Sequence, residues 1–132
     1  MFKELLEKQK NKKNIKFMER SEDVKEPYSE IDVLVPSVWY ENCPLVLAEA
    51  QITKTPVIAS NLGAIPEFVE DGRTGLLFEL DDPEDLYEKI IQIIRNSKMI
   101  EKFKINIKSP KSIAEQSREL EQIYNSLIWR LK

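Results

Sequence analysis

Two glutamates, Glu41 and Glu49, stand eight positions apart, and the second interrupts a stretch that is otherwise apolar. A carboxylate is costly to bury without hydrogen-bond donors, so Glu49 either reaches solvent or receives donors from a ligand. Two carboxylates can divide the roles of general acid and base. A single one can instead accept hydrogen bonds from the adjacent hydroxyls of a ribose. For an isolated helical glutamate, exposure to solvent is the commoner outcome.

The composition excludes several classes of protein. With 132 residues and 42% hydrophobic content, one compact domain is expected. Twenty basic and 23 acidic residues give a net charge of -3, which argues against nucleic-acid binding. The absence of histidine and the single cysteine, Cys43, argue against a metal site, triad chemistry and an internal disulfide. The N-terminus lacks a signal peptide's apolar core, and we expect a soluble cytoplasmic protein, at most peripheral to a membrane.

Short apolar runs alternate with longer helical patterns, which predicts the α/β class. We expect a partial Rossmann-like, doubly wound parallel sheet of about four strands, flanked by helices. The strands are predicted at residues 14–18, 32–37, 56–60 and 75–79. The helices are predicted at residues 2–12, 44–53, 82–96 and 110–131.

The loop that precedes the helix at residues 44–53 is a candidate anion site, because open α/β sheets bind ligands beyond the carboxyl ends of their strands. Proline suits the first helical position, so the helix is expected to begin at Pro44. Cys43 before it is a poor N-cap, which predicts unpaired amides at Leu45 and Val46 and a site for phosphate. The alternative is that Asn42 or water caps the helix.

A series of motifs then follows in order along the chain. They are Asp32-Val33-Leu34-Val35-Pro36-Ser37, the Glu41 and Glu49 pair with seven residues between them, Ala50, Thr55-Pro56-Val57-Ile58-Ala59-Ser60, Gly63-Ala64-Ile65-Pro66-Glu67, Asp71-Gly72 and Gly75-Leu76-Leu77-Phe78. The segment resembles the nucleotide-sugar-binding half of the retaining glycosyltransferases of GT-B architecture, glycosyl transferases group 1 or family 4. The resemblance covers residues 14 to about 95 and is weaker over residues 14–28, which resemble a strand and a short helix.

The resemblance implies a function and a role for each site residue. A hexose passes from a nucleoside diphosphate sugar to the hydroxyl of a glycan or lipid-linked acceptor, with retention and without a metal cofactor. Glu49 holds the ribose, and Glu41 lies near the donor sugar as the catalytic candidate. The amides of Leu45 and Val46 meet the diphosphate. Other nucleotide-sugar-binding positions lie in the preceding loop, at Ser37, Asn42, Cys43 and Pro44.

The chain also departs from the family pattern. The family's first strand, its Gly-Arg turn and a downstream lysine do not precede Asn14, and Glu19 replaces a usual glycine. We therefore expect residues 1–132 to form a single truncated domain, with C-terminal helices over residues 96–132, that is inactive alone. Its open sheet edge would be covered by direct pairing of the first two strands, a separate N-terminal chain or a homo-oligomer. The alternative function is a non-catalytic nucleotide-binding or interaction remnant.

Overall fold

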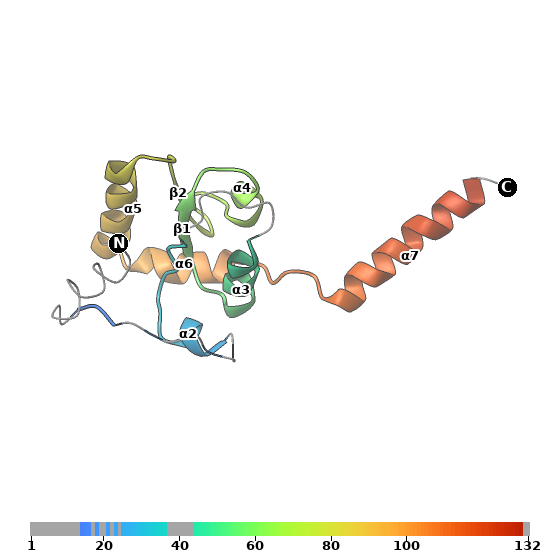
Figure 1. The fold of residues 1–132 in the computed structure, drawn as a ribbon, viewed down its shortest axis with the longest axis horizontal. Coiled ribbons are helices and arrows are strands. Elements are labelled where there is room, and N and C mark those ends of the chain that lie inside the picture. The colour runs from blue at the N-terminus through green and yellow to red at the C-terminus, as the bar shows by residue number, and fades with distance from the viewer. Residues whose placement is uncertain are drawn as a thin grey trace.

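The computed structural model describes residues 14–16, 18, 21, 23, 25–36 and 44–130 (Figure 1). The predicted helix at residues 2–12 lies outside the described residues. The elements are α2 (Lys25–Ser29), α3 (Leu45–Thr53), β1 (Val57–Ser60), α4 (Ile65–Phe68), β2 (Gly75–Phe78), α5 (Pro83–Arg95), α6 (Lys98–Asn106) and α7 (Ile113–Arg130). Helices and a small parallel sheet alternate, so the α/β class is confirmed.

The sheet consists of β1 and β2, which pair in parallel from Val57 opposite Gly75 to Ser60 opposite Phe78. Leu34 forms a single parallel bridge to Val57 on the other side of β1. Its amide donates to the Pro56 carbonyl at 2.9 Å, and the Ile58 amide donates to the Leu34 carbonyl at 2.9 Å. β1 is therefore the middle of three parallel segments.

The strands predicted at residues 56–60 and 75–79 are confirmed, with one end of each shortened by a residue. The prediction of a strand at residues 14–18 is wrong for the residues that are described, because they pair with no other strand. Ile15 and Met18 are exposed there, and Lys16 forms a surface ion pair with Glu30 at 2.6 Å. Over its described residues, 32–36, the strand predicted at 32–37 forms only the Leu34 bridge, because Pro36 has no amide to extend the pairing.

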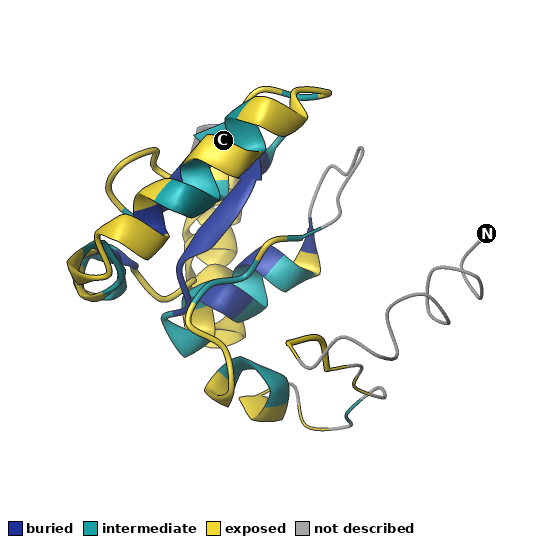
Figure 2. Cartoon of the chain, turned by 90° about the vertical axis from the view of Figure 1, so that its left-hand side faces the viewer, coloured by how far each residue is buried: buried dark blue, intermediate teal, exposed yellow. Residues whose placement is uncertain are grey.

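The two faces of β1 pack against different helices. Val57 and Ala59 contact the cluster that Leu47 and Ala50 of α3 form with Ile65 and Val69. Ile58 points the other way and packs with Leu76, Ile93 of α5 and Phe103 of α6. Figure 2 shows β1 as a buried strand between these helical layers. The continuous apolar run of β1 is typical of a strand covered on both faces.

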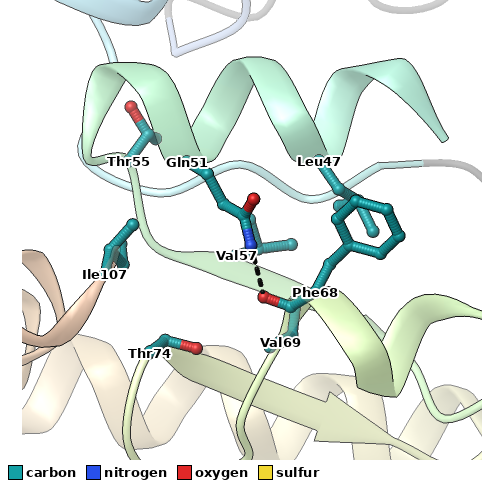
Figure 3. A pocket seen from close by; sticks show the side chains of 8 residues that line it. All are labelled: Leu47, Gln51, Thr55, Val57, Phe68, Val69, Thr74 and Ile107. Carbon is teal, nitrogen blue, oxygen red and sulfur yellow. Dashed lines mark hydrogen bonds between the residues drawn. The ribbon is translucent and has the colours of Figure 1, made fainter. Parts of the chain in front are cut away.

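Packing beneath α3 is tight. Figure 3 shows side chains from α3, β1, α4 and the loops that follow α3, α4 and α6, arranged around a small space. The volume of this space is about 10 Å³. The Gln51 side-chain amide donates to the Phe68 carbonyl at 3.1 Å and ties α3 to the end of α4. A space of this size barely admits one water molecule, so it is not a ligand cavity.

The two longer C-terminal helices agree with their predicted positions. Asp82 caps α5 by accepting from the amides of Glu84 and Asp85. Ser112 and Glu115 form a reciprocal capping box at the start of α7. α7 extends away from the body of the chain (Figure 1), and its side chains that are described are exposed. Within the part of the chain that is described, no helix is both long and apolar enough to span a bilayer.

Candidate functional site

The site is built on α3, which begins immediately after Pro44. Pro44 is buried and has extended backbone angles, φ −70° and ψ 106°, and no side-chain cap is formed there. The Leu47 amide donates to the Pro44 carbonyl at 3.0 Å, whereas the amides of Leu45 and Val46 have no partner among the described residues. Leu45 is 69% exposed, so this helix end is open to solvent. Unpaired amides at a positive helix end favour an anion.

The short turn between α3 and β1 sets the direction of α3. Lys54 adopts the left-handed conformation, φ 58° and ψ 30°, and its amide donates hydrogen bonds to the carbonyls of Ala50 and Gln51. Its side-chain Nζ donates to the Ile107 carbonyl at 2.6 Å. The chain turns back through Thr55 into β1, so the start of α3 lies toward the carboxyl end of β1. This is the end at which parallel sheets bind ligands.

Glu49 lies in the second turn of α3 and is half-buried. The Tyr28 hydroxyl of α2 lies 3.0 Å from Glu49 Oε2 and 3.2 Å from the Val46 carbonyl oxygen. The carboxylate therefore lies beside a carbonyl of the first helical turn. Burial of the phenol is the largest of the causes that raise the pKa of Tyr28 to about 12. The hydrogen bond to Glu49 and the negative charge of Glu49 are the next two.

Tyr28 is the residue that sequence reasoning missed. Solvent or a ligand was expected to satisfy the Glu49 carboxylate, and the structure shows that a phenol hydroxyl of the same chain supplies one donor. The two residues are 21 positions apart, and no local spacing rule connects them. The resemblance of residues 14–28 to a strand and short helix was the one signal near Tyr28.

The predicted site residues divide into two groups. Leu45, Val46 and Glu49 lie on the first two turns of α3, and Pro44 is the N-cap residue directly before them. Ser37, Glu41, Asn42 and Cys43 lie outside the described residues, as does Glu19. In the described part of the chain, no three acidic or cysteine side chains gather as metal ligands would.

The sequence profile for glycosyl transferases group 1 matches residues 2–96, which is most of the chain and extends beyond the expected residues 14–95 at its start. The chain belongs to this family. One relative is a D-inositol 3-phosphate glycosyltransferase from Nocardioides sp. (strain ATCC BAA-499 / JS614), 44% identical over 64 residues. That stretch is 48% of this chain and 14% of the relative, so this chain corresponds to a small part of that enzyme.

Solved structures of the glycosyltransferase family have the same fold. The C-terminal domain of a glycosyl transferase group 1 family protein, LpcC from Francisella tularensis, has a TM-score of 0.63 at 27% identity. The match covers 79% of this chain and 55% of that domain structure. Anabaena HepE, solved in complex with UDP and glucose, has a TM-score of 0.72 at 22% identity, with 95% of this chain and 34% of HepE covered. The expected GT-B fold class is confirmed.

Proposed function

We propose that this chain is the nucleotide-sugar-binding part of a retaining glycosyltransferase, which transfers a hexose from a nucleoside diphosphate sugar to an acceptor hydroxyl. The observation that carries the proposal is the pairing, on one short helix, of amides that have no partner among the described residues with a half-buried carboxylate. Family membership and the UDP complex of the similar HepE structure support it.

Two parts of the donor, the ribose and the diphosphate, have a matching group on α3. The ribose hydroxyls donate to the Glu49 carboxylate. The diphosphate accepts from the amides of Leu45 and Val46, whose partial positive charge is strengthened by the helix dipole. Because these amides are fixed in the folded chain, they also stabilise the negative charge that develops on the leaving diphosphate, without a metal ion.

The reaction exchanges one C–O bond for another at the anomeric carbon. The bond from this carbon to the diphosphate breaks, a bond to the acceptor oxygen forms, and the acceptor proton leaves with the diphosphate. We assign Glu41 a position near the donor sugar, and Ser37, Asn42, Cys43 and Pro44 to the surrounding loop. Because this chain corresponds to 34% of HepE, we expect it alone to bind the donor without transferring the sugar.

Calorimetric titration with UDP, GDP and ADP tests the proposal. We expect at least one of these nucleotides to bind, and a chelator to leave its affinity unchanged. Glu49→Ala should weaken binding by roughly tenfold to a hundredfold, the usual worth of hydrogen bonds to a charged group. The fold should survive, because the substitution removes ligand contacts and a single part-buried hydrogen bond from Tyr28.

A matched control is Glu88→Ala, which removes an exposed carboxylate from α5 without touching α3. Its affinity for nucleotide should equal that of the unaltered chain. If none of the three nucleotides binds at millimolar concentration, the proposed function is wrong. Equal affinities for Glu49→Ala and Glu88→Ala would remove only the ribose role of Glu49.

A further inference from the structure

We propose that Tyr28 is a positioning residue that holds the Glu49 carboxylate in the orientation that receives ribose hydroxyls. The inference rests on the proposed function and adds a residue from a different element to the site. Tyr28 lies on α2, more than a dozen residues before α3, yet its hydroxyl reaches two groups of that helix.

The hydroxyl has one proton, and two acceptors lie within reach of it. The Glu49 carboxylate is at 3.0 Å and the Val46 carbonyl is at 3.2 Å. A bond to an ionised acceptor is the stronger, so the proton goes to Glu49 Oε2. Because a free glutamate side chain samples several rotamers, this bond selects one of them before the ligand arrives.

The bond leaves acceptor capacity for a ligand. An ionised carboxylate has about four lone-pair positions, and Tyr28 uses one of them on Oε2. Oε1 has no partner among the described residues. Two adjacent ribose hydroxyls need two acceptor positions, so the ribose and Tyr28 can bind the carboxylate at the same time.

Tyr28 is itself held in place. Its half-buried ring packs against the cluster that contains Leu47, Ala50 and Val57. Its raised pKa keeps the phenol protonated at every pH at which nucleotide binding would be measured, so the donor is permanent. A rigid aromatic ring that packs against the core thus connects the position of α2 to the carboxylate on α3.

The test compares Tyr28→Phe with the unaltered chain against two ligands, UDP and its 2′,3′-dideoxy analogue. Tyr28→Phe keeps the ring and removes the donor. We expect UDP to bind roughly threefold to tenfold more weakly, the usual worth of one hydrogen bond. Binding of the dideoxy analogue should not change, because it has no hydroxyls for Glu49 to accept.

Tyr87→Phe on α5 is the matched control and should leave both affinities unchanged, because Tyr87 is exposed and distant along the chain. A loss of affinity for both ligands in Tyr28→Phe would indicate a general structural effect and overturn the inference. An unchanged affinity for UDP would overturn it as well. In Glu49→Ala, adding Tyr28→Phe should cost nothing further.

A second measurement separates failure of this inference from failure of the proposed function. Ultraviolet absorbance follows tyrosine ionisation without any ligand, and Glu49→Gln should lower the highest of the ionisation midpoints. If that shift is seen and the unaltered chain binds none of UDP, GDP and ADP, the pair exists but the proposed function and the positioning role are both wrong. If the shift is absent, the pair itself is refuted.

Discussion

Glu49 is a half-buried carboxylate in an apolar helix, and the Tyr28 hydroxyl offsets part of the cost of burying it. The Glu49 carboxylate can accept a hydrogen bond from Tyr28 and bind a ligand at the same time, because the phenol occupies only one of the carboxylate's acceptor positions. The same contact raises the pKa of Tyr28, which connects the site to the stability of the fold.

Stability should therefore depend on pH in the alkaline range. The unfolded chain releases the Tyr28 proton near pH 10, whereas the folded chain keeps it until about pH 12. The folded state binds more protons in this window, so the free energy of unfolding contributed by Tyr28 is fully present below pH 10 and is lost as the pH rises through 12. Denaturant unfolding of the unaltered chain and Tyr28→Phe at several pH values measures this.

The difference between the two chains isolates Tyr28, because the lysines and the other tyrosines titrate in both. The excess stability of the unaltered chain over Tyr28→Phe should shrink between pH 10 and 12. A difference that stays constant across this window would contradict the environment described for the phenol.

Strand β2 begins at a glycine that has no room for a side chain. A Cβ on Gly75 would lie 2.2 Å from the Val57 carbonyl oxygen and 2.9 Å from Val69 Cγ1. Val57 is paired to Gly75 in the sheet, so the first of these contacts is with the neighbouring backbone and is not easily relieved.

Gly75→Ala should therefore destabilise the fold by about 3 kcal/mol, since overpacking at the backbone displaces one strand from the other. Denaturant unfolding measures the change. Gly72→Asn is the matched control: its φ of +70° suits asparagine, and a Cβ there meets nothing within 4 Å. We expect it to cost under about 1 kcal/mol. Equal losses in the two variants would contradict the crowding at Gly75.

Elements with strong local signals could be predicted from the sequence. α5 has a proline and acidic residues after Asp82, and β1 is a continuous apolar run between turns. The strand expected at residues 14–18 had an apolar pattern but no partner to pair with in the described part of the chain.

Half of the candidate site could be placed at the start of α3 from the sequence, whereas Tyr28 depends on a contact between distant segments. Both outcomes depend on contacts between segments that are distant in the sequence, and a local residue pattern does not reveal such contacts.

Three layers form the body of the protein, and α7 stands apart from it. α3 and α4 cover one face of the sheet, and α5 and α6 cover the other. α7 presents exposed apolar side chains along its length, namely Ile113, Leu120, Ile123, Tyr124, Leu127 and Ile128. These side chains bury little surface against the body, so they add little to its stability.

Removing residues 111–132 should therefore leave the thermal midpoint of the body within about 2 °C of that of the full chain, since a shift of that size corresponds to well under 1 kcal/mol. Calorimetry or circular dichroism measures the midpoint. Phe103→Ala serves as the contrast: this side chain is 2% exposed, and its loss should cost about 4 kcal/mol. A large fall on removal of the segment would mean that α7 packs on the body in solution.

The start of α3, whose first two amides have no partner in the described part of the chain, also suits the protein to optical detection. Cys43 is the single cysteine of the sequence and directly precedes Pro44, two positions before the amide of Leu45. A thiol-reactive dye would therefore attach at one defined position, without any substitution, next to the helix end at which the diphosphate is proposed to bind. A dye on that thiol would report nucleotide by a change in fluorescence if the diphosphate binds there as proposed.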